Sequence, residues 1–138
     1  MTAIEPSFHC DYSFNIHTHG LAVINYNCVI LDTSPVHIGA GAFTAPGVCM
    51  AYSGHSIDPE QRSHSIGTSA PITLEDNVWV GANATVCGGV TIGAGSVIGA
   101  GSVVTHDIPA GAIAAGAPCR MIRPITERDK IDLDKILF

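Results

Sequence analysis

The side chains best suited to acid–base chemistry near neutral pH are the seven histidines of this 138-residue chain. Two of them, His55 and His64, lie in a polar stretch, residues 52–70, that interrupts a regular apolar pattern. Loops that project from a regular scaffold commonly carry function. A loop histidine without further context is more often an ordinary surface residue, so the histidine type alone does not identify a base.

The basic side chains gather at one end of the chain. Residues 1–119 contain one cationic side chain, Arg62, against eight acidic residues. The other five cations lie within the last 19 residues: Arg120, Arg123, Arg128, Lys130 and Lys135. An anionic ligand would therefore be drawn to the C-terminal end, whereas the net charge of −6 argues against a nucleic-acid partner.

The thiols and the remaining histidines give no sign of a metal site. The cysteines are odd in number, widely spaced and without a CxxC pair: Cys10, Cys28, Cys49, Cys87 and Cys119. They predict neither a disulfide framework nor a zinc cage, and we expect reduced, mostly buried thiols. No histidine set has the spacing of metal ligands, so we expect no metal.

The composition predicts one soluble, cytoplasmic domain over residues 1–138. Hydrophobic residues make up 46% of the chain and charged residues 13%, which is too apolar for a disordered protein. No apolar run reaches the length of about 18 residues that a membrane span needs, and the N-terminus does not resemble a signal peptide. The 15 glycines and 8 prolines favour a turn-rich β architecture.

A six-residue repeat organises most of the chain. Aliphatic residues recur at strict i+6 steps, with a second set of small or β-branched residues four positions after each. The first set is Leu74, Val80, Val86, Ile92, Ile98 and Val104, and the second is Val78, Ala84, Val90, Ser96, Ser102 and Ile108. The pattern returns at Ile38, Thr44 and Met50, and less cleanly at Ile16, Ala22 and Cys28.

A period of six fits neither an α-helix nor an ordinary strand, but it fits short strands wound as a coil. Glycines such as Gly81, Gly93 and Gly99 can adopt the backbone angles that coil corners need. We expect coils over about residues 12–120, with residues 52–70 as a projecting loop. Residues 121–138 should form a C-terminal segment with a short helix that caps the open end.

Five segments of the chain resemble one family. They are CDYSFNIH, INYNCVILD, GHSIDPEQR, PITLEDNVWVGANATV and GAGSVVTHDIPAGAIAAGAPCRMIR, within residues 8 to 130. Together they are similar to the maltose, galactoside and nodulation-type members of the hexapeptide-repeat O-acetyltransferases. The resemblance implies a left-handed parallel β-helix and a homotrimer with its active sites between subunits. It also implies transfer of acetyl from acetyl-CoA to a hydroxyl of a sugar-like acceptor.

The resemblance also assigns roles to single residues. His55 matches the catalytic base of a direct ternary mechanism, and Asn25 matches a residue near the acceptor and the reacting carbonyl. Asp11 and Asp32 match polar positions that line the acceptor pocket, although either carboxylate also suits a turn cap. Asn25 equally suits a left-handed corner. The positions that match the acetyl-CoA site are Trp79, Gly81, Ala82, Ala100, Thr105, Arg120 and Arg123.

Two differences from the family affect the acceptor. Its members usually begin with about fifty more residues that help to close the acceptor pocket, and Gly67 replaces a larger residue over the acceptor. We therefore expect a wider, less selective pocket. Two alternatives stay open: an acetyltransferase for a xenobiotic or amino-sugar acceptor, and a non-catalytic β-helix assembly module.

Overall fold

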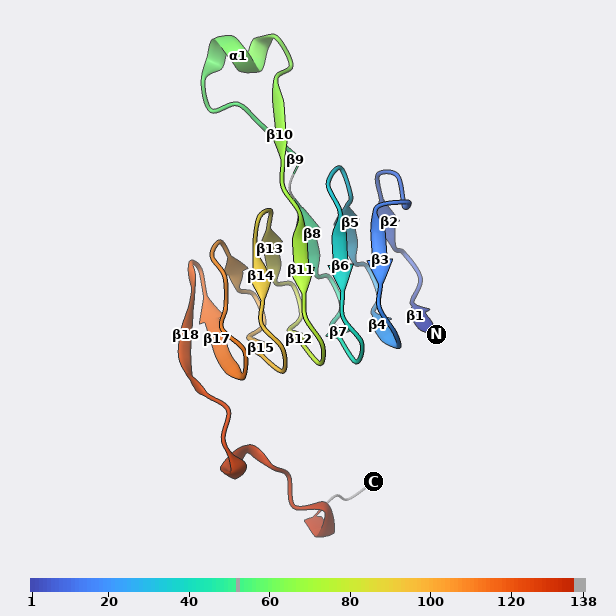
Figure 1. Cartoon of the computed structure of the whole chain (residues 1–138), viewed down its shortest axis with the longest axis vertical. Coiled ribbons are helices and arrows are strands. Elements are labelled where there is room, and N and C mark those ends of the chain that lie inside the picture. Colours follow the sequence, from blue (N-terminus) through green and yellow to red (C-terminus); the bar gives the residue numbers. More distant parts are fainter. Residues whose placement is uncertain (52, 136–138) are drawn as a thin grey trace.

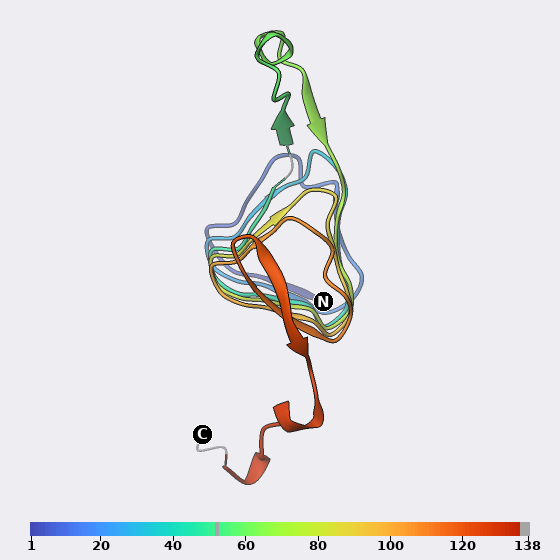
Figure 2. The same cartoon turned by 90° about the vertical axis from the view of Figure 1, so that its left-hand side faces the viewer.

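The computed structural model describes residues 1–51 and 53–135, which form a three-sided prism of short parallel strands (Figures 1 and 2). It is the left-handed parallel β-helix that the family resemblance implies. The chain passes from one sheet to the next at each corner, so neighbours within a sheet come from successive coils. We call the three sheets A, B and C.

Sheet A has seven strands and contains both ends of the prism. In spatial order they are β1 (Thr2–Ile4), β4 (Ala22–Ile24), β7 (Phe43–Thr44), β12 (Trp79–Val80), β15 (Val97–Ile98), β17 (Ala112–Gly116) and β18 (Cys119–Pro124). All pair in parallel except β18, which folds back antiparallel on β17 and brings Cys119 into the core.

Sheets B and C complete the triangle. Sheet B contains β2 (His9–Cys10), β5 (Val29–Leu31), β8 (Cys49–Ala51), β13 (Thr85–Cys87) and β16 (Val103–Val104). Sheet C contains β3 (Ile16–Thr18), β6 (Val36–Ile38), β11 (Ile72–Leu74) and β14 (Thr91–Ile92).

Both predicted i+6 sets point into the prism. The first set, from Leu74 to Val104, is at most 1% exposed, and the second set, from Val78 to Ile108, at most 5%. Each inward side chain stacks on its equivalent in the next coil, as in other repeat proteins. The two buried serines keep their hydroxyls paired, since Ser96 Oγ donates to the Pro109 carbonyl and Ser102 Oγ to the Gly99 carbonyl, each over 2.6 Å.

The expected reason for the corner glycines is wrong for Gly81, Gly93 and Gly99. The left-handed backbone angle falls two residues later, for example at Asn83 (φ 56°) and Gly101 (φ 70°). Gly81 is glycine for a different reason, because a Cβ there would lie 2.6 Å from the backbone nitrogen of Ala100 in the next coil. Close approach between coils, rather than a positive φ, requires glycine at this position.

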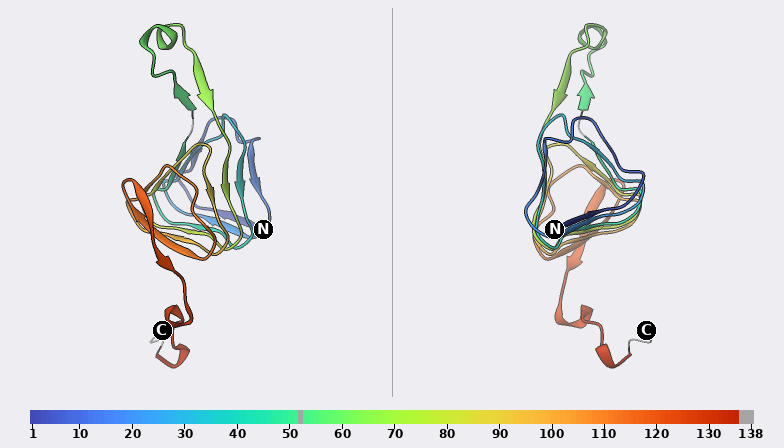
Figure 3. Two further views of the ribbon diagram at one scale, coloured as in Figure 1. Left: turned by 60° about the vertical axis from the view of Figure 1, so that its left-hand side comes forward. Right: turned by 90° about the vertical axis from the view of Figure 1, so that its right-hand side faces the viewer.

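The predicted projecting loop is a long arm that leaves the corner between sheets B and C (Figures 1 and 3). It consists of β9 (Ser53–His55), helix α1 (Pro59–Ser63) and β10 (Gly67–Ser69), with β9 and β10 antiparallel. Residue 52, where the predicted loop begins, lies outside the described residues. No residue of α1 is buried, so the arm stands clear of the prism.

The C-terminal segment is helical but does not cap the coil. It forms two 3₁₀ turns, η1 (Glu127–Asp129) and η2 (Leu133–Lys135), without a buried residue. The segment extends away from the prism on the side opposite the arm (Figure 1), so the expected cap is wrong. Residues 136–138 lie outside the described residues, and no helix in the described part of the chain is long and apolar enough to cross a membrane.

Candidate active site

His55 ends β9, the first strand of the arm, and its side chain is exposed. In the antiparallel register His55 lies opposite Gly67, so no side chain covers it from the other strand. Within the described part of the chain its ring has no hydrogen-bond partner. A catalytic histidine normally has its ring oriented by a third group, and the described residues of this chain provide none for His55.

Polar contacts fix the arm directly beyond His55. The Arg62 guanidinium donates from Nη1 to the carbonyl oxygens of Ser56 (3.0 Å) and Ile57 (2.9 Å). Asp58 caps α1 by accepting from the Gln61 amide over 2.9 Å, and Ser56 Oγ lies 2.7 Å from Gln61 Oε1. The arm therefore has a defined shape without a core of its own. The sequence did not indicate this role for Arg62.

Asp11 and Asp32 lie at the same corner of the prism as the arm. The Asp32 side chain is buried and accepts hydrogen bonds from the amides of Asp11 (3.1 Å), Tyr12 (2.8 Å) and Asn15 (3.2 Å). Asp11 is exposed and accepts from Thr33 Oγ1 over 3.3 Å. This geometry supports the turn-capping alternative for Asp32 and leaves Asp11 accessible to a ligand.

The hydrogen bonds to Asp32 also set its charge. Burial by itself raises the pKa of this carboxyl, but the backbone amides that donate to it outweigh burial and hold the pKa below its ordinary value. Asp32 is therefore a fixed negative charge inside the corner, and a proton-transfer role does not fit it.

Asn25 and Trp79 lie together on sheet A. They line a shallow cavity of about 350 Å³ with Val23, Phe43 and Ala45. Trp79 is 53% exposed and pairs in register with Phe43, which is 49% exposed. The Asn25 side-chain oxygen accepts a hydrogen bond from the Tyr26 amide over 2.8 Å. The side-chain amino group of Asn25 therefore remains available to donate to other partners. The repeat pattern does not indicate that Phe43 belongs to this group.

Gly81, Ala82 and Ala100 lie at the corner between sheets A and B, directly after β12 and β15. The Gly101 amide donates to the Ala82 carbonyl over 2.8 Å, which links the two coils. Ala82 is partly exposed and Ala100 is exposed, whereas Gly81 is buried against the next coil. The two alanines therefore offer a small-residue surface, and Gly81 serves the packing of the coils.

The predicted phosphate-binding residues separate into two groups. Arg120, at the start of β18, lines a cavity of about 270 Å³ together with His106 and Asp107. Thr105 lies beside this group, with Oγ1 2.9 Å from His106 Nδ1. Arg120 donates to the Cys119 carbonyl, so most of its guanidinium donors remain available.

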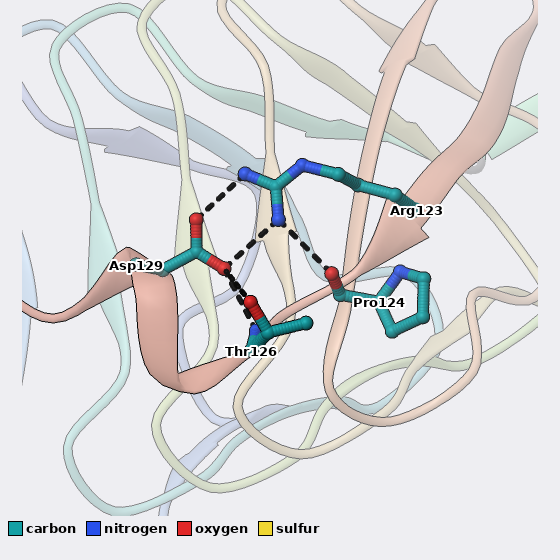
Figure 4. Close-up of polar contacts among 4 residues, drawn as sticks. All are labelled: Arg123, Pro124, Thr126 and Asp129. Atoms are coloured by element: carbon teal, nitrogen blue, oxygen red, sulfur yellow. Dashed lines mark hydrogen bonds and ion pairs between the residues drawn. The ribbon is translucent and has the colours of Figure 1, made fainter.

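Arg123 is already paired within the chain (Figure 4). Its guanidinium donates to both carboxylate oxygens of Asp129, over 2.6 and 2.8 Å, and to the Pro124 carbonyl over 3.1 Å. The Arg123 hydrogen bond is the main reason that the pKa of Asp129 lies well below its usual range. Arg123 therefore holds η1 against β18, a role the sequence did not reveal, and Arg120 is the freer cation.

The five cysteines are free thiols, two buried and three half-buried. Burial raises the pKa of Cys49 and of Cys119, which disfavours a thiolate at both positions. Among the described residues, no group of three or more His, Cys, Asp or Glu side chains is arranged to hold a metal ion.

One chain does not bring all these residues together. His55, Asp11 and Asp32 belong to the corner between sheets B and C, which in a triangular prism lies opposite sheet A (Figure 2). Asn25 and Trp79 line sheet A, and Ala82 and Ala100 lie at its corner with sheet B. The candidate base and the candidate cofactor surface therefore meet only if two copies of the chain associate.

Comparison with known proteins supports membership of the family that the sequence resembles. The bacterial transferase hexapeptide model, six repeats, matches residues 71–106. The galactoside O-acetyltransferase of Escherichia coli K12 is 45% identical over 92% of this chain and 63% of its own length. A maltose O-acetyltransferase structure from Clostridium difficile 630 superposes with a TM-score of 0.90 and 41% identity, over 92% of this chain and 68% of that one.

A third relative was solved with the expected co-substrate. It is the hexapeptide-repeat acetyltransferase VCA0836 of Vibrio cholerae, complexed with acetyl coenzyme A, with a TM-score of 0.88 and 36% identity over 91% of this chain and 69% of that one. The chain belongs to the hexapeptide-repeat acetyltransferase family. It spans less than two thirds of the length of several curated relatives, the galactoside O-acetyltransferase of Escherichia coli K12 among them.

Proposed function

We propose that this chain transfers an acetyl group from acetyl-CoA to a hydroxyl of a sugar or similar small acceptor. Family membership supports the reaction type, and the acetyl-CoA complex of the Vibrio cholerae relative supports the donor. The observation that carries the proposal is the placement of His55. Its ring is exposed on an arm that Arg62 holds through backbone hydrogen bonds, and it has no partner among the described residues of its own chain.

In this mechanism His55 is the general base. Its imidazole takes the proton of the acceptor hydroxyl while that oxygen attacks the thioester carbonyl of acetyl-CoA. The carbon–sulfur bond then breaks, and His55 returns the proton to the sulfur of CoA. The Asn25 amide is suited to donate a hydrogen bond to the charge that develops on the carbonyl oxygen. The acetyl group passes directly between the two bound substrates.

The proposed acetyl-CoA surface consists of exposed and cationic side chains. Trp79 is an exposed aromatic side chain, and Ala82 and Ala100 leave room for an extended chain to approach the backbone. Arg120 supplies a cation for the phosphates at the C-terminal end. Arg123 supplies a second cation when its hydrogen bonds to Asp129 break. Thr105 lies at the same end.

The active assembly is a homotrimer with sites between subunits. The outward residues of sheet A from β4 to β17 are apolar, as are several along sheet B: Val23, Phe43, Trp79, Val97 and Ile113 on A, and Val29, Cys49 and Val103 on B. Along sheet C they are His17, His37, Thr73 and Thr91. Two different apolar faces at one corner fit a head-to-tail contact, which closes as a ring.

The acceptor site is wide, which favours a second candidate acceptor class. Gly67 lies opposite His55 and brings no side chain over it. A bulky xenobiotic or an amino sugar would fit such a site as well as a simple sugar. An amine acceptor would need the same base, so His55 keeps its role under both candidates.

The test is acetyl transfer from acetyl-CoA to a panel of sugars, amino sugars and hydroxylated antibiotics. We expect release of CoA thiol with at least one acceptor class, and an acetylated product by mass spectrometry. Stabilisation by CoA in a thermal shift experiment should accompany it. If CoA neither binds nor is released with any acceptor, the chain is a non-catalytic β-helix assembly module and the proposal is wrong.

A further inference from the structure

Sheet C carries three histidines on its outer surface that have no part in the proposed reaction. His17 in β3 and His37 in β6 lie directly opposite each other in the parallel register. Alternate residues of a strand point to the same face, so the side chain of His19 lies on the same face of the sheet as that of His17. Ring centroids are 5.1 Å apart for His17 and His37, and 5.3 Å apart for His19 and His37. We call these three residues the histidine ladder.

Two nitrogens of the histidine ladder face each other. His19 Nε2 lies 3.1 Å from His37 Nδ1, and which of them carries the shared proton depends on the tautomer. Two imidazole nitrogens bound to one metal ion, each at about 2.0–2.1 Å, lie roughly 2.9–3.4 Å apart in octahedral or tetrahedral geometry. The spacing of this pair is therefore within the range of two ligands on one ion, but the rings meet nearly head-on, so each must tilt to turn its lone pair from the other nitrogen towards the ion.

The surroundings of the pair favour a cation. His19 and His37 line a cavity of about 480 Å³ whose other lining residues include Glu75 and Asp76. Hydrogen bonds from the Ala94 amide to Glu75 and from the Ala40 amide to Asp76, both 2.8 Å, hold the carboxylates in place. No lysine or arginine lines this cavity.

We propose that His19 and His37 chelate a divalent first-row transition metal ion, through Nε2 and Nδ1 respectively. Imidazole suits Ni²⁺, Cu²⁺ and Zn²⁺ among such ions. His19 then keeps its proton on Nδ1 and His37 on Nε2, so that both facing nitrogens present lone pairs. No third side chain among the described residues converges on this point, so water completes the coordination. His17 is a positioning residue that stacks on the His37 ring.

The probe is Ni²⁺, because thiols compete less for it than for Zn²⁺ or copper. Titration calorimetry on the intact, reduced protein should show one Ni²⁺ per chain. His19→Ala or His37→Ala should weaken binding by about tenfold or more, and His17→Ala by less. The matched controls are His9→Ala and His64→Ala, two exposed histidines elsewhere on the molecule, which should bind as the wild type does.

Two further readouts make the outcome decisive. Affinity should fall on acidification, because a protonated imidazole does not bind metal. Ni²⁺ should also raise the melting temperature of the wild type but not of the His19→Ala/His37→Ala double variant. Undiminished Ni²⁺ binding by the double variant, or no binding by the wild type, would overturn the proposal. Circular dichroism shows whether each variant is folded.

Discussion

At the scale of single residues, Asp32 is a candidate site residue whose role proves to be structural. The sequence is compatible with two roles for Asp32, a contact to the acceptor and a turn cap. In the fold its carboxylate is buried and accepts from three backbone amides of residues 11–15. Spacing in sequence does not reveal this, because the donors come from the preceding coil.

Asp32 makes stability depend on pH. Its pKa is lowered by folding, so its contribution to the free energy of unfolding is fully present above the unfolded pKa of about 3.9. That contribution is lost as the pH falls through the lower, folded value. We expect Asp32→Ala to destabilise the protein by about 1–3 kcal/mol at neutral pH, because buried amides lose their acceptor.

Urea denaturation at several pH values measures both effects. The variant should lose less stability than the wild type as the pH falls below about 4. The matched control is Asp58→Ala, on the exposed arm, which should change global stability little. A neutral effect of Asp32→Ala would contradict the structural role assigned to this residue.

At the scale of elements, the arm is the least self-supporting part of the described structure. None of the residues in α1 is buried, and the shape of the arm depends on polar contacts such as those of Arg62. The sequence predicted that residues 52–70 project, since they interrupt the repeat. It did not predict α1 or the Arg62 contacts, because neither has a periodic apolar signal.

Replacing Arg62 by methionine should loosen the arm without unfolding the prism. The carbonyls of Ser56 and Ile57 would lose their donor and return to water. We expect faster amide hydrogen exchange around residues 56–66, an unchanged melting temperature and a kcat several-fold lower at an unchanged pH profile. Arg62→Lys, which keeps a charge but not the guanidinium fork, should recover only part of the activity. Unchanged exchange in the arm would show that Arg62 does not fix it.

At the scale of the whole molecule, the six-residue repeat predicts the prism. It says less about how copies of the chain assemble. Every i+6 aliphatic from Leu74 to Val104 is buried, because a six-residue period leaves one geometry for a stacked core. The direction of the C-terminal segment was not predictable, since neither η1 nor η2 buries a residue that an apolar pattern could reveal. The repeat pattern predicts a corner glycine at Gly81, whereas contact with the next coil requires it.

The proposed trimer depends on the apolar faces of sheets A and B. Phe43→Glu places a charge in the apolar row of sheet A and should convert the trimer into monomers, with loss of activity. Thr91→Glu, on the polar face of sheet C, is the matched control and should leave the trimer intact. Size-exclusion chromatography with light scattering measures both. A wild-type chain that is stably monomeric would contradict the proposed site between subunits.

The steady-state rate of CoA release by His55→Ala measures whether His55 is the base of an acetyl-CoA-dependent transfer. We predict a fall in kcat of about 10²–10⁴-fold, while CoA still stabilises the variant as it does the wild type. The control His64→Ala, in the same arm, should be fully active. Turnover by His55→Ala at the wild-type rate would show that His55 is not the base.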